Sequence, residues 1–176
     1  MTIEEQIKSV IRDVPNFPKE GIIFKDISTI MLDPNLSNNI LDHLVNVYQK
    51  MDFDVVAGIE SRGFLFGYAL AIRLNKPFVL IRKKGKLPYD KISFDYALEY
   101  GTATIEMHTD AIQEGQKVLI HDDLLATGGS AEAAAKLVQQ AGGEIAGFNF
   151  LVALDFLNGS QKLSIISDNI INLAVY

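Results

Sequence analysis

The sequence contains no cysteine, so disulfide bonds and thiolate–metal sites are excluded. It also lacks any apolar run of the roughly 18 residues that a membrane-spanning helix requires. We therefore expect no membrane contact. The N-terminal residues 1–5 include two acids and show no signal-peptide pattern, which favours a cytoplasmic protein.

A basic face is also missing. The 22 acidic residues outnumber the 16 lysines and arginines and leave a net charge of −6. Proteins that hold long stretches of nucleic acid need clustered positive charge, so we expect no nucleic-acid partner. Small anionic ligands are compatible with this composition, because they need only a local cationic pocket.

The order of apolar segments predicts the fold class. The length of 176 residues and the hydrophobic fraction of 48% are typical of one domain with a substantial core. Continuous apolar runs that alternate with helical segments are the mark of a buried parallel sheet. The prediction is an α/β fold, an open, doubly wound and mostly parallel sheet flanked by helices. Its predicted strands are 55–59, 78–81, 117–120 and 146–152, and its predicted helices include 64–74 and 131–141.

Three segments outside this alternation have signals of their own. Thr2 and Glu5 form a capping box for an N-terminal helix, which the prolines and glycine of 15–21 should end in a loop. Asp33 precedes a proline in the pattern of a second helix start. The polar stretch 83–107 reads as a lid, a long loop with two extra strands lying over one end of the sheet.

The clearest signal for a ligand site is the stretch 118–130, in which a hydrophobic strand, two acids and a loop of small residues precede a helix. Ligands of open α/β sheets bind at the carboxyl ends of strands. Glycines in such a loop let N–H groups form an anion-binding nest, and the helix N-terminus adds partial positive charge. Asp122 and Asp123 can bind ribose hydroxyls or hold Mg²⁺ through water. We predict a ribose 5-phosphate site whose phosphate is bound by Ala126, Thr127, Gly128, Gly129 and Ser130.

Two acids followed by Ala-Thr-Gly-Gly-Ser resemble the phosphoribosyl-pyrophosphate motif of the type I phosphoribosyltransferases, and 122–129 resembles the version in their adenine-specific branch. Three positions depart from the pattern. His121 replaces an aliphatic residue and is expected to pack at a strand end, Lys25 stands where arginine is common, and Ser130 where threonine is usual. The resemblance covers nearly the whole chain in order, through 17–18, 21–27, 58–64, 81–83, 85–88 and 98–101.

The resemblance implies two groups of residues around the leaving pyrophosphate. One is a loop with Glu60, Ser61 and Arg62, in which relatives often have a cis peptide between the first two; a plain turn with a surface arginine is the alternative. The other is the basic run that contains Lys83 and Lys86. A solvated charge run is the alternative for this segment.

The resemblance also implies a base site and a lid over it. Phe24 would stack on adenine, with simple core packing as the alternative. The backbone of Ile23 and Lys25 would read the ring edge, and Leu124 would cover its other face. In the lid, Glu99 would bind the base and handle its proton, and Tyr100 would close with it over the reacting ring.

The implied activity is purine salvage, in which adenine replaces pyrophosphate on 5-phosphoribosyl 1-pyrophosphate and gives AMP through an oxocarbenium-like transition state. Mg²⁺ would be held mainly by the substrate. The resemblance further implies a homodimer and one domain with an N-terminal hood in residues 1–34. A phosphoribosyltransferase for xanthine, guanine or orotate and a non-catalytic, ligand-sensing relative are the alternatives. The expected catalytic residues are Glu99, Asp122, Asp123, Arg62 and Lys86.

Overall fold

The computed structural model describes residues 1–17, 19–97 and 101–176. In this part of the chain a seven-stranded sheet has the order β5-β6-β4-β3-β7-β8-β9, and β1 pairs with β2 in a separate sheet. The helices are α1 (Ile3–Val10), α2 (Pro34–Tyr48), α3 (Gly63–Arg73), α4 (Gly129–Gln140) and α5 (Gly159–Leu163), with 3-10 helices η1 (Ile27–Leu32) and η2 (Asp155–Leu157). The strands are β1 (Arg12–Pro15), β2 (Ile23–Asp26), β3 (Val55–Ile59), β4 (Phe78–Lys83), β5 (Lys91–Ala97), β6 (Thr102–His108), β7 (Lys117–Leu125), β8 (Glu144–Ala153) and β9 (Ile170–Val175).

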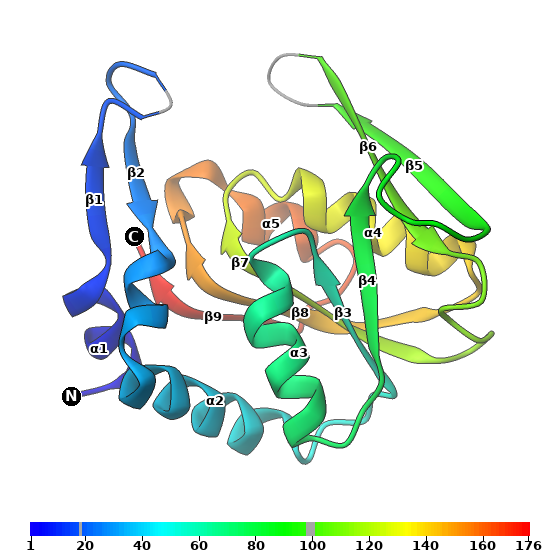
Figure 1. Cartoon of the computed structure of the whole chain (residues 1–176), viewed down its shortest axis with the longest axis horizontal. Coiled ribbons are helices and arrows are strands. Elements are labelled where there is room, and N and C mark those ends of the chain that lie inside the picture. The colour runs from blue at the N-terminus through cyan, green and yellow to red at the C-terminus, as the bar shows by residue number, and fades with distance from the viewer. Residues whose placement is uncertain (18, 98–100) are drawn as a thin grey trace.

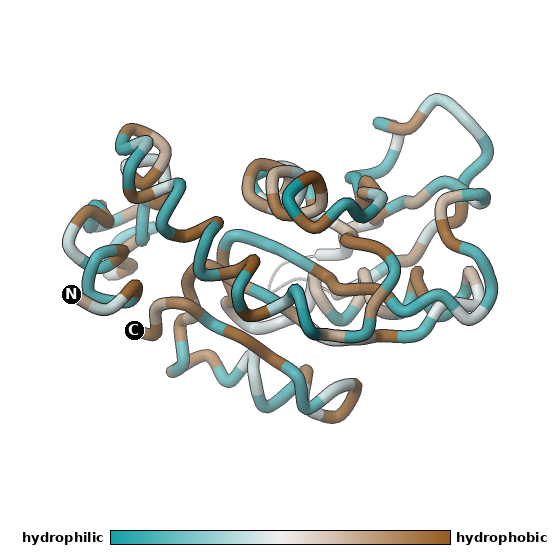
Figure 2. Tube along the Cα trace, turned by 90° about the horizontal axis from the view of Figure 1, so that it is seen from below, coloured by the Kyte–Doolittle hydropathy of each residue, from teal (hydrophilic) through white to brown (hydrophobic). Residues whose placement is uncertain are grey.

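The sheet is mostly parallel, as predicted. β3 pairs in parallel with β4 and β7, and β8 pairs in parallel with β7 and β9, whereas β5 and β6 run antiparallel at one edge. Two apolar clusters cover its faces: one joins the sheet to α4, and the other joins it to α1, α2 and α3. Figure 2 shows apolar segments recurring along the chain trace in the middle of the molecule. The predicted α/β class with helices on both faces is confirmed.

Both predicted helix starts are present. The Thr2 hydroxyl accepts from the N–H of Glu5, whose carboxylate accepts from the N–H of Thr2, so the capping box is complete. The Asp33 carboxylate accepts from the N–H groups of Asn35 and Leu36 at 2.9 and 3.1 Å. These side chains satisfy N–H groups that have no partner inside a helix.

Some predictions about strands were wrong or incomplete. β7 continues through both acids to Leu125, because pairing with β8 persists to Leu125 and Ala153. The loop expected from Pro15 onward is preceded by a strand, β1, which the sequence analysis did not predict and in which Pro15 is tolerated at the end of an edge strand. The two extra strands predicted in 83–107 are present as β5 and β6, but they extend the edge of the sheet and were wrongly expected to lie over its end. The sequence analysis also missed β9, which pairs with β8 at the opposite edge.

Candidate active site

Two hairpins project in the same direction from opposite ends of the molecule, β1–β2 on one side and β5–β6 on the other (Figure 1). A cavity of about 980 Å³ has walls from both hairpins. Ile23 and Lys25 line it from β2, Tyr96 and Ala97 from β5, and the whole loop 126–130 from the β7–α4 connection. The cavity therefore joins the predicted phosphate loop to the predicted base pocket.

The loop 126–130 has the conformation that an anion site needs. Gly128 adopts a φ of +81°, which favours glycine, immediately before α4. No side chain of the described residues caps this helix, so its first N–H groups have no side-chain acceptor there. The Ser130 hydroxyl lies 3.3 Å from the Tyr96 hydroxyl. The predicted phosphate-binding residues thus line one cavity at a helix N-terminus.

The two acids of β7 have different surroundings. Asp122 lines both the large cavity and a second cavity of about 500 Å³. Asp123 is 5% exposed and accepts a hydrogen bond from the Arg62 guanidinium. Burial, together with the neighbouring Asp123 carboxylate, raises the pKa of Asp122 well above its usual range. Gly63 permits the start of α3 to approach this strand, because a Cβ there would lie 2.8 Å from Asp122 Oδ1.

The loop between β3 and α3 holds the Glu60–Ser61 cis peptide that the resemblance implied. Its Arg62 forms an ion pair with Asp123, and its guanidinium carbon lies 6.0 Å from the centroid of the Phe24 ring. Arg62 therefore lies between the sheet and the β1–β2 hairpin, beside the acids, where the sequence analysis expected a pyrophosphate ligand.

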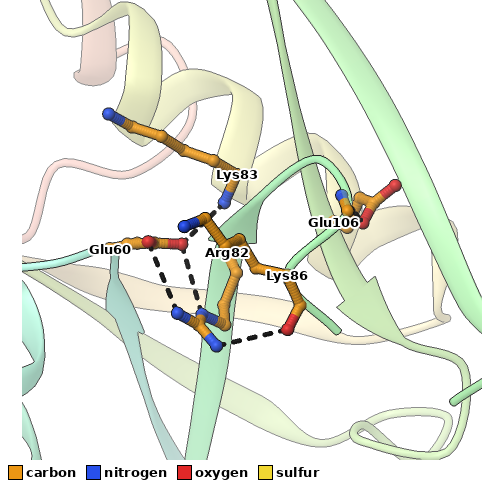
Figure 3. Close-up of polar contacts among 6 residues, drawn as sticks. Glu60, Arg82, Lys83, Lys86 and Glu106 are labelled. Carbon is orange, nitrogen blue, oxygen red and sulfur yellow. Dashed lines mark hydrogen bonds and ion pairs between the residues drawn. The ribbon is translucent and has the colours of Figure 1, made fainter. Parts of the chain in front are cut away.

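Glu60 and the basic run form one network (Figure 3). The Glu60 carboxylate accepts from Arg82 Nε at 3.2 Å and from the Lys83 N–H at 2.9 Å, while Arg82 Nη1 donates to the Lys86 carbonyl at 3.2 Å. Burial acts to raise the pKa of Glu60, but these hydrogen bonds outweigh it and lower the pKa below its usual value. Glu60 and Lys83 line the second cavity, whereas Lys86 is exposed on the turn and lines neither of the two cavities.

The base-site residues are only partly brought together. Ile23, Lys25 and Leu124 line the large cavity. Phe24 does not, because its side chain alternates away from theirs and packs edge-on against Phe17 at 5.2 Å between ring centroids. Glu99 and Tyr100 lie outside the described residues.

Sequence reasoning missed other parts of the cavity wall. Tyr96 lines both cavities, and Leu154, Phe156 and Leu157 follow the carboxyl end of β8 and line the large one. The rule that ligands bind at the carboxyl ends of strands could have found the β8 residues. No motif distinguished Tyr96.

Comparisons with known proteins agree with this geometry. Residues 31–165 match the phosphoribosyl transferase domain family. An adenine phosphoribosyltransferase from Cytophaga hutchinsonii is 52% identical over 162 residues, which cover 92% of this chain and 90% of that protein. The chain belongs to the adenine phosphoribosyltransferase family.

Solved adenine phosphoribosyltransferases share the whole fold. The enzyme from Thermoanaerobacter pseudethanolicus has a TM-score of 0.94 at 47% identity, covering 99% of this chain and 100% of its own. The enzyme from Giardia lamblia, solved with 9-deazaadenine, has a TM-score of 0.93 at 33% identity, covering 100% of this chain and 98% of its own. The overall topology described above is therefore that of the family.

His121 is one of the three positions at which the sequence departs from the pattern described above. It is buried in β7, and its Nδ1 lies 2.7 Å from Asn149 Oδ1. Burial lowers its pKa to about 4, so the imidazole is neutral at pH 7. The residue is buried, as expected, but it lies within β7 and not at its end.

Two further searches cover only the described residues. They contain no group of three or more His, Cys, Asp or Glu side chains arranged to hold a metal ion. None of their helices combines the length and hydrophobicity of a membrane span.

Proposed function

We propose that the chain makes AMP and pyrophosphate from adenine and 5-phosphoribosyl 1-pyrophosphate, with the two cavities as its active site. The observation that carries the proposal is that Asp122, Tyr96 and Ser130 line both cavities. The reaction needs a phosphate held at one end of the ribose and a pyrophosphate leaving from the other. The loop 126–130 serves the first need, and the cavity beside Glu60 and Lys83 serves the second.

The phosphate loop supplies orientation and remote binding energy. Backbone N–H groups of 126–130 and the hydroxyls of Thr127 and Ser130 bind the 5′-phosphate. Interactions far from the reacting carbon lower the barrier because they fix the ribose between base and leaving group. Asp122 and Asp123 orient the ribose hydroxyls and stabilise the positive charge that develops on the ring.

Arg62, with Lys83 and Lys86, stabilises the departing pyrophosphate. The Arg62 Nε donates to Asp123, which orients the outer nitrogens of the guanidinium for two parallel bonds to phosphate oxygens. Glu60 holds the Lys83 N–H, so the basic turn is fixed relative to the loop that contains Ser61 and Arg62. Lys86 then acts from the exposed end of this turn.

The residues around Asp122 fit a Mg²⁺ ion held mainly by substrate phosphates. Asp122 lines both cavities, and a nearby cation would favour ionisation of its carboxyl, whose pKa is raised by desolvation and by the neighbouring Asp123. Asp122 or Asp123 would hold the ion through water. When bound, Mg²⁺ neutralises charge on the leaving pyrophosphate.

The base binds between the hood, residues 1–34, and the lid, residues 83–107. The backbone of Ile23 and Lys25 pairs with the 6-amino group and N1 of adenine, Leu124 covers one ring face, and Phe24 offers the other. Glu99 and Tyr100 close over the base, so that Glu99 handles its proton and water is excluded from the reacting carbon. Because Phe24 packs against Phe17 and lies outside the large cavity, this stacking requires its ring to leave that packing.

Two copies of the chain form a homodimer through α3 and β4. Leu65, Tyr68 and Ile72 on α3 are 50%, 56% and 59% exposed, and Leu80 on β4 is 40% exposed. Apolar groups on neighbouring elements are typical of an interface. Light scattering tests the pairing: Tyr68→Glu should halve the measured mass, whereas a monomeric wild type would contradict it.

The decisive experiment for the activity measures pyrophosphate release with adenine, hypoxanthine, guanine, xanthine and orotate, with and without Mg²⁺. Main-chain groups that match adenine would place a donor against the N1 donor of a 6-oxo purine. Such a mismatch can make kcat/KM for the 6-oxo purine about 10⁴ lower than for adenine. We expect turnover with adenine only and loss of activity after chelation. Higher activity with another base would favour a different phosphoribosyltransferase, and no turnover with any base would favour a ligand-sensing relative.

A further inference from the structure

None of the residue roles proposed above involves the hydroxyl of Tyr96. Tyr96 belongs to β5, the edge strand of the sheet, and lines both cavities. Its hydroxyl lies 3.3 Å from the Ser130 hydroxyl at the start of α4. A phenol from the lid hairpin therefore reaches the loop that is proposed to hold the 5′-phosphate.

The ring of Tyr96 is held in place independently of any ligand. It is half-buried and packs against the apolar cluster between the sheet and α4. A Cβ built on Gly129 would lie 3.8 Å from the ring, so the ring crosses directly over the phosphate loop. Because the ring is fixed by packing, its hydroxyl reaches the loop at little further cost in side-chain entropy.

The contact with Ser130 does not use the full capacity of either hydroxyl. Hydroxyl pairs normally approach to about 2.7 Å, so 3.3 Å marks a weak hydrogen bond. Each hydroxyl has one hydrogen to donate, and a phosphate oxygen with full negative charge is a much stronger acceptor than a second hydroxyl. Both can rotate toward an anion in the cavity that they line.

We propose that the Tyr96 hydroxyl is a ligand of the 5′-phosphate, donating to it beside Ser130. The inference rests on the proposed function, since it takes the loop 126–130 as the phosphate site. It adds a donor from β5 to a site otherwise built from the β7–α4 connection. A phosphorylated ribose then ties the lid hairpin to the phosphate loop, and ribose without the phosphate does not.

The test compares Tyr96→Phe, which removes one oxygen and keeps the packed ring, with Tyr89→Phe. Tyr89 is 59% exposed and packs its ring edge-on against His108, so it is a matched control outside both cavities. Calorimetry with AMP and steady-state kinetics are the measurements. Loss of a hydrogen bond to a charged group should weaken AMP binding and raise the KM for phosphoribosyl pyrophosphate about tenfold. The KM for adenine and the melting temperature should stay at wild-type values, and Tyr89→Phe should match the wild type throughout.

A second variant, Ser130→Ala, distinguishes failure of the Tyr96 inference from failure of the proposed phosphate site. If Ser130→Ala weakens AMP binding and Tyr96→Phe does not, the loop holds the phosphate without Tyr96 and the inference is wrong. If neither variant changes AMP affinity, the phosphate lies elsewhere and the proposed use of the loop fails with it. Weaker binding in Tyr96→Phe, with adenosine affinity unchanged, would support a contact to the phosphate itself.

Discussion

The phosphate loop and the β1–β2 hairpin form opposite walls of one cavity, but they are built differently. The loop follows β7, a central strand with buried residues along most of its length, and leads into α4, which packs on the main core. In β1 and β2, every residue is at least partly exposed. The wall that would meet a phosphate is rigid because the core holds it, and the wall that would meet the base depends on local contacts.

Those local contacts are polar and aromatic. Lys25 Nζ lies 2.7 Å from Asp13 Oδ1 and 4.1 Å from the centroid of the Tyr176 ring. We therefore expect that substitutions that alter the backbone of the phosphate loop will strongly reduce phosphate binding. Truncation of a side chain on the hairpin should have little effect on base binding if the hairpin backbone recognises the base.

The largest expected effect is that of Gly128→Val. A side chain at a φ of +81° is strained, and a Cβ there would approach the Gly159 carbonyl to 3.2 Å. We expect AMP affinity to fall by at least about 10³, because several N–H donors to the phosphate are displaced together. Calorimetry measures this.

Gly115→Val is the matched control for strain. Gly115 has a φ of +78°, and a Cβ there would meet no described atom within 4 Å. This variant should lose stability and bind AMP normally. Wild-type affinity in Gly128→Val would mean that the rigid wall is not the phosphate site.

Asp122→Asn should separate activity from stability on the same wall. Turnover should fall about 10²- to 10³-fold as the electrostatic stabilisation of the transition state is lost. Because the folded pKa of Asp122 is raised, its ionisation lowers stability as pH rises above the usual value near 3.8. The variant should therefore melt higher than the wild type at pH 7, and this gain should vanish at low pH. Exposed Asp110→Asn is the control, and near-normal turnover in Asp122→Asn would contradict the assigned role.

The sequence predicted the rigid wall better than the hairpin. The 122–130 motif is contiguous, so strand, loop and helix follow from local residue types, and the structure places all five loop residues on one cavity. The Glu60–Ser61 cis peptide agrees with the resemblance.

What the sequence could not predict depends on pairing between distant segments. β1 exists because Arg12–Pro15 pairs with Ile23–Asp26, and β7 extends through the acids because β8 runs beside it. Tyr96 approaches Ser130 only once the β5–β6 hairpin joins the sheet edge. Such contacts leave no periodic signal in one segment.

His121 allows a test through pH, because it is fully buried in β7, the strand that leads into the phosphate loop. Its folded pKa of about 4 is below the unfolded value of 6.5, so the unfolded chain binds a proton that the folded chain does not. The free energy of unfolding therefore has its full His121 contribution above pH 6.5. This contribution, about 3 kcal/mol, is lost as pH falls toward 4.

Urea denaturation between pH 4.5 and 7.5 tests this contribution. His121→Gln should have a flatter dependence of the unfolding free energy on pH than the wild type, whatever its stability at pH 7. Exposed His43→Gln should keep the wild-type slope. Equal slopes in all three proteins would show that His121 is not protonated on unfolding in this range.

Lys25→Ala should have the smallest effect and tests the hairpin wall directly. The side chain lines the cavity, yet its ammonium is paired with Asp13 and lies over Tyr176, and the proposed reading of adenine uses the Lys25 backbone. Loss of a pair whose acid is exposed costs about 1 kcal/mol at most, so kcat/KM for adenine should fall less than about fivefold. The preference for adenine over hypoxanthine should not change, since the main-chain donors and acceptors stay in place. Lys50→Ala, on an exposed surface, is the control for removal of a positive charge. A lost or reversed base preference in Lys25→Ala alone would show that the ammonium reads the base, and the hairpin would then be as dependent on one side chain as the phosphate loop is on Gly128.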